Sequence, residues 1–561
     1  MHFMKQTVRE KIIEIVGEVC RDLFSGSPPP IIIENPRRKG HGDLSTNVAL
    51  LLAKRAGSSP TQVAERVAGE LRRRADFYPG LCRKLEIAGP GFINIFLSPQ
   101  ALQSQLLIIL RRGAAYGALD AGIKEKVQLE FVSANPTGPL TVAHGRQAAV
   151  GDSLARILTK TGRDVSREYY LNDKGRQIQL LGISTRQRYR ELFGERIEIP
   201  RDGYRGSYII EIAKKIKERD GDKWLCKKGK DSIDFFESFS VREVMNMILK
   251  DLEDFRVCFD HWTSEKEHIE SRNIELCLDY LRREGYIYEE GGAVWFRSSS
   301  LGDDKDRVLV KSKGERTYFA SDIAYHRDTF EKGFDRVIDL WGPDHHGYVS
   351  RMRAAIKALG YDENRLSPII VQLTTLFRGQ QKLSMSTREG EFVTLREVID
   401  EVGVDAARYF FVRMRTDSHL NFDLEFAKRR SYDNPVYYVQ YVHARICSIF
   451  KKLGSKKPSF KLSSWDKVPI ELLQEAEELN LIKLLSDFPI AVQRSAETLE
   501  PNRICNYLEE LAAAFHQSYT KHTVISDDDS MTAARLALAE GVRIVIQIGL
   551  LLLGVSAPES M

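Results

Sequence analysis

A chain of 561 residues is long enough for about three to five domains, each with its own hydrophobic core. Its 43% hydrophobic and 29% charged residues exclude extended disorder, and a net charge of +5 is too small to indicate a nucleic-acid partner by itself. The seven cysteines form no Cys-x-x-Cys pair, which argues against a disulfide framework or a cysteine-rich zinc site and predicts reduced thiols.

No segment of the sequence indicates a membrane or a secretory signal. Residues 1–19 are charged and amphipathic, and the most apolar uncharged run, residues 544–558, is shorter than the roughly 20 residues that cross a bilayer. We therefore expect a cytoplasmic protein without membrane contact.

Residues 1–118 predict a small α+β domain. Helices are expected at 5–24, 46–55 and 60–74, and a strand at 91–97 between Pro and Gly residues. Residues 1–120 hold 17 Lys and Arg against 11 Asp and Glu, whereas the rest of the chain is slightly negative. The basic runs 37–39 and 72–74 are typical either of a solvated surface or of phosphate contacts, and charge alone does not decide between the two.

Residues 119–430 predict an α/β domain. Strands are expected at 127–132, 336–340 and 369–373, with helices beginning at Val142 and Val349. Such alternation indicates a parallel sheet with crossover helices. The polar, irregular stretch 184–300 is interpreted as one insertion into this fold.

Residues 431–561 predict an all-α bundle. Apolar side chains recur every three or four positions over 437–446 and again over 536–548. Tyr437, Tyr438 and Tyr441 follow the same spacing. They are interpreted first as core residues, although aromatic rings can also stack on splayed RNA bases.

The most informative stretch is residues 130–146, which read EFVSANPTGPLTVAHGR. The pattern predicts a strand, a turn built on Pro and Gly, and a helix with His144 in its first turn. Free N–H groups at a helix N-terminus favour anions such as phosphate. A lone histidine there would usually be a structural side chain, so the length of the motif decides its interpretation.

This stretch resembles the signature motif of class I aminoacyl-tRNA synthetases, in the form found in arginyl-tRNA synthetases. Further segments resemble the same family in the same order, namely 40–47, 89–94, 304–310, 318–326, 341–346, 385–395, 434–445 and 557–561. The resemblance implies a Rossmann catalytic domain with an insertion, an additional N-terminal domain that contacts the tRNA elbow, and a C-terminal anticodon-binding bundle. It also implies arginine–tRNA ligation with ATP and Mg²⁺, no resident metal, and a monomer.

The resemblance assigns roles residue by residue. Catalytic contacts fall to His144, Thr141, Ser386, Arg388 and Lys382. Arginine contacts fall to Glu130, Ser133, Asn135, Tyr318, Asp322 and His346. ATP contacts fall to Gly145, Gly342, Asp344, His345 and Met385, and tRNA contacts to Arg37, Arg38, Lys39, Asn47, Tyr441 and Arg445.

The chemistry of arginine supports one assignment independently. A planar guanidinium with five donors is best met by a carboxylate. Tyr318 and Asp322 are spaced i and i+4 and share one face if their segment is helical. A site that hydrogen-bonds such a polar side chain rejects analogues by about 10⁴ to 10⁵, so no editing domain is expected.

The sequence departs from the family motifs at several positions. Thr141 replaces the first histidine of the signature and Ala143 its glycine, while Ser384 and Thr387 stand where the second motif carries lysines. We expect Lys382 and Arg388 to compensate and the enzyme to be active. The alternatives are a catalytically silent tRNA-binding paralogue, a cysteinyl-tRNA synthetase, for which the expected zinc ligands are missing, and a small-molecule nucleotidyltransferase, which the flanking domains disfavour.

Overall fold

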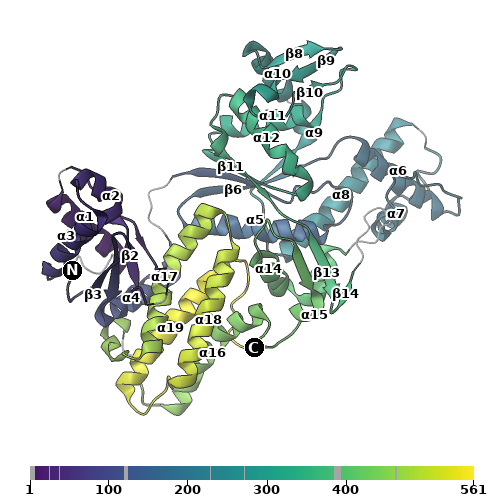
Figure 1. Ribbon diagram of the computed structural model, residues 1–561. Coiled ribbons are helices and arrows are strands. Elements are labelled where there is room, and N and C mark those ends of the chain that lie inside the picture. The colour runs from purple at the N-terminus through teal and green to yellow at the C-terminus, as the bar shows by residue number, and fades with distance from the viewer. Residues whose placement is uncertain are drawn as a thin grey trace.

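The computed structural model describes residues 7–561 except 25, 37, 39, 119–123, 228, 271, 384–392 and 462–463, and except the side chains of 268–270. These residues form an N-terminal α+β unit, a central α/β unit and a C-terminal helical unit (Figure 1). In the part of the chain so described, no helix is apolar and long enough to cross a membrane.

The N-terminal unit combines a four-stranded antiparallel sheet with three helices, in agreement with the α+β prediction. Capping boxes begin two of the helices, Thr7 with Glu10 and Ser59 with Gln62, because each pair satisfies otherwise free backbone N–H groups. The sheet order is β1-β2-β4-β3. The elements are α1 (Val8–Leu23), β1 (Ile33–Glu34), β2 (Leu44–Thr46), α2 (Val48–Ala56), α3 (Pro60–Arg73), β3 (Cys82–Ala88) and β4 (Phe92–Leu97).

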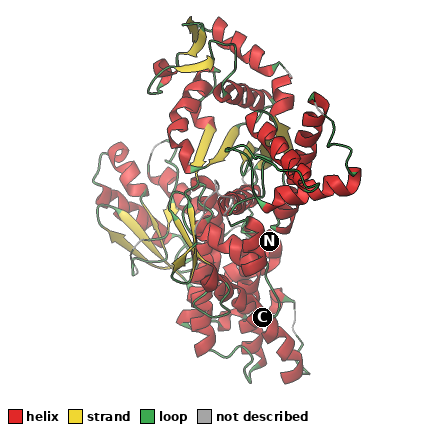
Figure 2. Ribbon diagram, turned by 90° about the vertical axis from the view of Figure 1, so that its right-hand side faces the viewer, coloured by secondary structure: helices red, strands yellow, loops and turns green. Residues whose placement is uncertain are grey.

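The central unit is built on a five-stranded parallel sheet of order β12-β11-β5-β6-β7 (Figure 2). The strands are β5 (Lys126–Glu130), β6 (Asp164–Leu171), β7 (His261–Ser264), β11 (Arg336–Trp341) and β12 (Leu366–Ile370), and α5 (Val142–Lys160) connects β5 to β6. From β5 the chain continues to β6 and β7 on one side of the sheet, whereas β11 and β12 lie on the other side of β5. The crevice between the carboxyl ends of β5 and β11 is therefore the place where open parallel sheets bind ligands.

The expected single insertion at 184–300 is two separate segments. Strand β7 lies within that range and pairs with β6 in the central sheet. Between β6 and β7 lie α6 (Arg176–Glu191), α7 (Ser207–Asp220) and α8 (Lys230–Asp254). After β7 follow α9 (Glu265–Glu270), α10 (Asn273–Arg283) and an antiparallel sheet of β8 (Ile287–Glu290), β9 (Ala293–Phe296) and β10 (Arg307–Val310), then α11 (Tyr318–Glu331). The prediction was wrong here because β7 has only four residues and no alternating pattern.

The chain then passes through a small mixed sheet to the helical unit. The intermediate elements are the 3₁₀ helix η4 (Pro343–Tyr348), α12 (Val349–Ala358), β13 (Thr374–Arg378), β14 (Gln381–Lys382), α13 (Leu395–Val402), α14 (Val404–Arg413), β15 (Leu420–Asp423) and α15 (Leu424–Ala427). The helical unit consists of α16 (Pro435–Lys456), α17 (Ala476–Thr498), α18 (Asn502–Lys521) and α19 (Asp529–Leu552). Their apolar faces pack on one another, as the helical spacing predicts.

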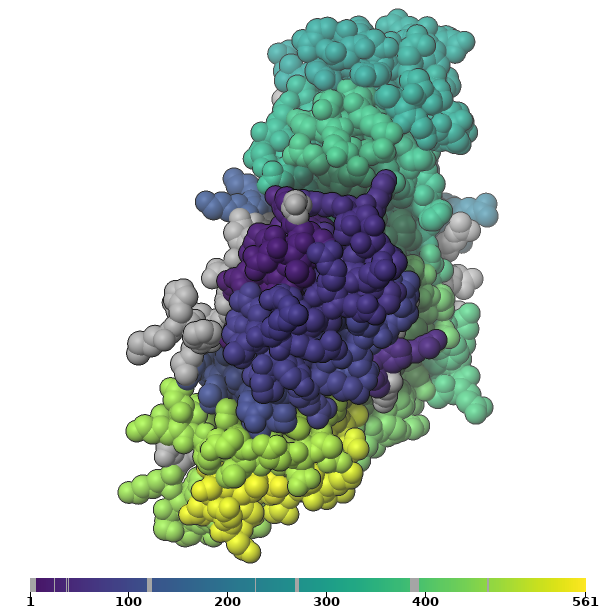
Figure 3. Space-filling view, turned by 60° about the vertical axis from the view of Figure 1, so that its left-hand side comes forward, coloured from purple at the N-terminus to yellow at the C-terminus, as the bar shows by residue number. Residues whose placement is uncertain are grey.

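The N-terminal unit rests on the helical unit (Figure 3). Helix α4 (Pro99–Arg112) follows its sheet and packs against α17 and α19. Arg9 pairs with Asp487 at 3.4 Å, and Lys483 pairs with Asp43 at 3.0 Å. Apolar and ionic contacts thus join the first and last parts of the chain.

A buried arginine joins the helical unit to the central one. Arg408 on α14 is fully buried, and its guanidinium lies 2.5 Å from the Asp152 carboxylate on α5. It also donates to the carbonyl of Leu553, at 2.9 Å, just after α19. Gly554 adopts a φ of +67°, and a Cβ there would lie 2.2 Å from the guanidinium. The close approach therefore depends on the missing side chain.

Candidate active site

The turn after β5 carries strained backbone. Val132 and Ser133 have φ values of 69° and 36°, in the left-handed region that is costly for a β-branched residue such as valine. The Ser133 hydroxyl donates to Glu130 at 2.9 Å and accepts the Tyr170 N–H at 3.1 Å. Asn135 accepts a bond from Asn172 at 2.9 Å and donates to Gln177 at 2.7 Å. These contacts to β6, α6 and the loop between them hold the turn at the sheet crevice.

His144 lies in the first turn of α5, behind the N-cap Thr141. The Thr141 N–H donates to Nδ1 of His144 at 3.2 Å, so Nδ1 is the acceptor and a neutral ring carries its proton on Nε2. Burial lowers the pKa of His144 to about 4. The imidazole is therefore a neutral donor at physiological pH. Gly145 is buried, and a Cβ there would lie 2.7 Å from Leu395, so its position permits close packing of α5.

A cluster of buried acidic side chains, called here the acidic pocket, includes Glu130 at the end of β5 and Asp322 on α11. Asp322 accepts a hydrogen bond from the Tyr348 hydroxyl, and burial, opposed by that bond, raises the pKa of its carboxyl. Burial, reinforced by the charge of Asp339, also raises the pKa of Glu130. His326 is a neighbouring buried cation that lowers the pKa of both carboxyls, but burial outweighs it. The pocket is suited to a cationic ligand.

The structure adds one residue to this pocket that the sequence interpretation missed. Glu265 directly follows β7 and is 5% exposed. Burial, followed by the negative charge of Asp322, raises the pKa of Glu265 to about 7. An acid directly after a strand of a parallel sheet is a signal that sequence could supply, but the interpretation of 184–300 as an insertion concealed β7.

Tyr318 and Asp322 do lie on one helix, α11, as their spacing predicts. Their environments differ, however, because Tyr318 is 73% exposed. Tyr348, which the sequence did not indicate, makes the contact with Asp322. Tyr318 thus stands at the rim rather than inside the pocket of this structure.

The carboxyl end of β11 leads into Gly342, Asp344 and His345, which are expected for ATP, and His346, which is expected for arginine. Gly342 precedes η4, and Asp344, His345 and His346 are exposed along it. His345 is close enough to Asp322 to lower the pKa of that carboxyl, although burial outweighs it. This segment therefore lies next to the acidic pocket, on the side facing β12.

The second motif is attached directly to the start of α5. Thr394 forms a β-bridge with Thr141, and the Leu395 N–H donates to the Leu140 carbonyl at 2.7 Å. On the other side of the motif, Lys382 is exposed on β14. Met385, Ser386 and Arg388, and the departures Ser384 and Thr387, lie outside the described residues. The C-terminal flank of the motif therefore lies against the start of α5.

A cavity of about 1050 Å³ opens at the α5 N-terminus. One wall is the signature turn, with Asn135, Gly138, Thr141 and His144. The opposite wall is the loop between α6 and α7, residues 201–208. The segment assigned to an insertion therefore forms part of the site.

The structure describes two of the four expected tRNA residues of the N-terminal unit. Arg38 is exposed, Asn47 is half-buried at the N-cap position of α2, and Arg37 and Lys39 lie outside the described residues. The second basic run is paired internally, since Arg73 contacts Glu70 at 3.0 Å and Arg74 contacts Glu18 at 2.8 Å. Arg73 and Arg74 therefore belong to ion pairs within the N-terminal unit.

The tyrosines of α16 form a half-buried cluster and not a core. Tyr441 stacks against Tyr437 and His516, and Tyr432, at its edge, is 59% exposed. Arg445 lies 5.0 Å from the Tyr519 ring. Aromatic faces and a cation are thus grouped on one surface of the helical unit.

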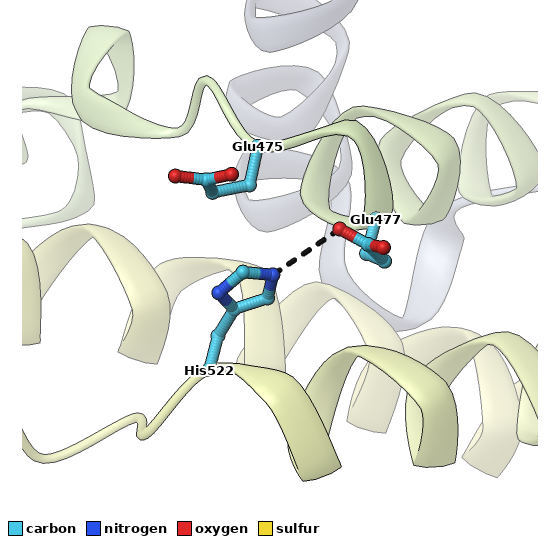
Figure 4. A group of neighbouring side chains, drawn as sticks. All are labelled: Glu475, Glu477 and His522. Carbon is cyan, nitrogen blue, oxygen red and sulfur yellow. Dashed lines mark hydrogen bonds and ion pairs between the residues drawn. The ribbon is translucent and has the colours of Figure 1, made fainter.

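Glu475, Glu477 and His522 are the one group within the described residues whose ligand atoms are close enough for a metal ion (Figure 4). Their bonds explain the proximity without one. Lys521 and His522 donate to Glu477, and these bonds lower the pKa of Glu477 to about 2. The Glu475 N–H takes part in the cap of α17. The group is a helix-end ion pair.

A neutral histidine at the start of the helix after the first strand, at the switch point of a parallel sheet, fits the catalytic domain of a class I aminoacyl-tRNA synthetase, and the match to that family model shows the class. Three family models match the chain. They are the arginyl tRNA synthetase N terminal domain at 2–97, the class I (R) catalytic domain at 105–421 and the DALR anticodon binding domain at 439–561.

Similar known proteins match this chain over nearly its whole length. The chain is 49% identical to an arginine–tRNA ligase of Desulfosudis oleivorans, covering 95% of each chain, and 47% identical to one of Syntrophotalea carbinolica, covering 100% of each. The arginyl-tRNA synthetase structure from Thermus thermophilus shares the fold, with a TM-score of 0.75 and 21% identity over 99% of this chain and 100% of that one. The chain belongs to the arginyl-tRNA synthetase family, enzymes that use ATP to attach arginine to tRNA. The cysteinyl and nucleotidyltransferase alternatives are thereby excluded.

Proposed function

We propose that the protein forms arginyl-adenylate and transfers arginine to tRNA in the crevice between β5 and β11. The observation that supports this most is the acidic pocket of Asp322, Glu265 and Glu130, placed directly beside a helix N-terminus suited to phosphate. A cation-binding pocket next to an anion-binding one is what arginine and ATP together require.

Arginine recognition rests on Asp322. The guanidinium would add positive charge beside this carboxyl, where His326 offsets burial only in part, and Glu265 would contribute a second acid. Tyr348 holds the Asp322 carboxyl in one orientation. Tyr318 and His346, both exposed, would close over the bound side chain from the rim.

The α-amino group would be held by the turn after β5. Ser133 and Asn135 offer polar atoms there, and the buried Glu130 carboxyl, whose pKa is raised by burial, would ionise against the cationic amino group. The substrate carboxylate would then point toward the α5 N-terminus. Orientation of this kind lowers the barrier by positioning the reacting atoms.

Adenylate formation begins when a carboxylate oxygen attacks the α-phosphorus of ATP and the bond to the leaving pyrophosphate breaks. The Nε2–H of His144 and the first free N–H groups of α5 would stabilise the phosphate oxygens. Thr141, Lys382, Met385, Ser386 and Arg388 would complete this contact, and Gly342, Asp344 and His345 would border the adenosine, with Gly145 permitting close packing. ATP would enter with Mg²⁺ as its counter-ion.

Transfer follows when a ribose hydroxyl of the tRNA terminus attacks the acyl carbonyl and AMP leaves. Arg37, Arg38, Lys39 and Asn47 would contact the tRNA from the N-terminal unit. Tyr441 and Arg445 would contact the anticodon region from α16, where their cluster offers stacking faces. We further propose a monomer in the cytoplasm, where the seven unpaired cysteines would stay reduced.

The test is a charging assay of the purified protein with ATP, Mg²⁺ and total tRNA, supplied in turn with each labelled amino acid. Charging by arginine alone is expected. Absence of all charging would overturn the proposal and favour a silent tRNA-binding protein. Asp322→Asn serves as the variant in which arginine charging should fall most.

A further inference from the structure

The loop between α6 and α7 forms one whole wall of the cavity at the α5 N-terminus. Arg201, Tyr204, Arg205 and Tyr208 face Thr141 and His144 across a space of about 1050 Å³. That volume is in the range of a nucleotide-sized pocket. A ligand that fills the cavity would contact this wall.

The loop is fixed to the signature turn by Tyr208. Its hydroxyl donates to the Thr137 carbonyl at 2.6 Å, and its ring covers Gly138, where a Cβ would lie only 3.1 Å from that hydroxyl. At the other end the Tyr204 N–H donates to the Ser184 hydroxyl at 2.9 Å, on α6. The loop is thus anchored on both sides of Arg205.

The charge of this wall is positive. Asp202 is paired with Arg176, and that hydrogen bond lowers the pKa of its carboxyl. Among the described residues, Arg201 and Arg205 have no carboxylate partner. Arg205 donates only to carbonyls of its own loop, at 3.3 and 3.4 Å. Both guanidinium charges are available to a ligand.

The opposite wall lacks formal charge. Thr141 is neutral, and burial lowers the pKa of His144 to about 4, so its ring is neutral as well. Arg201 and Arg205 are therefore the cations among the described residues that line the cavity. A nucleotide phosphate in this space would meet helix N–H groups on one side and guanidinium groups on the other.

We infer that Arg201 and Arg205 bind phosphate oxygens of a substrate nucleotide, and so replace charge that Thr141, Ser384 and Thr387 do not supply. The inference rests on the proposed function. The phosphate belongs either to the polyphosphate of ATP or to the terminal phosphodiesters of tRNA, since both must approach the α5 N-terminus. The amino acid side chain is excluded as the ligand, because a guanidinium would be repelled here and attracted to Asp322.

The test compares Arg201→Gln, Arg205→Gln and the double variant with wild type. Arg196→Gln is the matched control, because Arg196 is an exposed arginine of the same connection that does not line the cavity. Dissociation constants of ATP–Mg²⁺ and of total tRNA are measured by calorimetry and filter binding at several salt concentrations, alongside that of L-arginine. The thermal midpoint of each variant checks its fold.

Loss of one charge-assisted hydrogen bond to phosphate should weaken binding by about tenfold or more. Weaker binding of ATP with unchanged tRNA binding identifies the polyphosphate as ligand. Weaker tRNA binding, with a salt dependence reduced by about 0.7 in log–log slope per lost contact, identifies the tRNA end. Unchanged affinity for both, or equal loss in Arg196→Gln, would overturn the inference. Failure of the proposed function shows separately, as absence of arginine charging by wild type.

Discussion

His326 is held between two acceptors at the base of the acidic pocket, with its Nε2 2.9 Å from the Asp339 carboxylate and its Nδ1 2.8 Å from the Asp322 carbonyl. Both ring nitrogens must donate, so the ring is an imidazolium. Burial opposes this charge, but Asp339 prevails and raises the pKa of His326 to about 9. His326 is thus the buried cation beneath the carboxyls that face arginine.

Stability should therefore fall at alkaline pH. The folded pKa of His326 lies above its unfolded value of about 6.5, so its contribution is complete below pH 6.5 and is lost as pH rises through about 9. We expect His326→Gln to lower the free energy of unfolding by about 2 kcal/mol at pH 6.5. Denaturant unfolding at pH 6.5 and 9.5 should show a smaller difference in unfolding free energy between wild type and variant at pH 9.5 than at pH 6.5. A deficit independent of pH would contradict the ion pair.

Replacement of Asp322 should affect arginine above all. Asp322→Asn keeps the shape but removes the charge that the guanidinium needs, so the KM for arginine should rise about 100-fold or more. The KM for tRNA should change little. Steady-state charging measures both, with Asp328→Asn as control, because Asp328 lies on the same helix but pairs with Lys332. Equal effects of the two variants would point to damage of α11.

Arginine binding should depend on pH through Glu265. With a pKa of about 7, Glu265 is protonated in much of the free enzyme at neutral pH, and a cationic ligand favours its ionised form. Affinity should rise between pH 6 and 8, with release of a proton. Calorimetry in buffers of different ionisation enthalpy counts the protons. At pH 7, Glu265→Gln should release about half a proton fewer than wild type, whereas Glu267→Gln, exposed on the same helix, should behave as wild type.

His144 should contribute to catalysis as a neutral donor. Loss of one such donor costs about 10² to 10³ in kcat, and we expect this for His144→Ala. Because burial keeps the pKa of His144 near 4, the ratio of wild-type to variant kcat should stay constant from pH 6 to 9. His522→Asn, on the distant helical unit, is the control. A ratio that changes near pH 6.5 would indicate a charged imidazole.

The basic run at 37–39 should act on tRNA alone. Replacing Arg37, Arg38 and Lys39 by Gln should raise the KM for tRNA and reduce its salt dependence, by about 0.9 in log–log slope per lost phosphate contact with duplex. Arginine affinity should be unchanged. Arg73→Gln is the control, since Arg73 is already paired with Glu70. A parallel loss of arginine affinity would contradict the role assigned to this unit.

Elements with a strong local pattern were predictable. The strand and helix around His144 have a long apolar period and a turn rich in Pro and Gly, and both are present. Tyr318 and Asp322 also meet the condition set for them, since both lie on one helix. The helices are determined locally because their hydrogen bonds lie within the segment or its caps. Strand β5 pairs with the distant β6 and β11, and only its apolar run made it recognisable.

Residues brought together by distant pairing were not predictable. Strand β7 pairs His261 with Glu168, 93 positions earlier, and its four residues have no period of their own. Because the sequence did not indicate β7, it did not indicate Glu265, which directly follows that strand. Tyr348 reaches Asp322 from another element, and Tyr208 reaches Thr137 over 71 positions. Such contacts depend on the assembled fold, which one sequence does not disclose.

Gly554 is a position at which one small substitution would weaken the attachment of the helical unit. A methyl group at this position would displace the Arg408 guanidinium from Asp152 and Leu553, and the left-handed backbone there disfavours any side chain. The catalytic residues would be untouched at permissive temperature, while the attachment of the helical unit would weaken first on heating. Gly554→Ala is therefore the substitution from which a temperature-sensitive allele could be made.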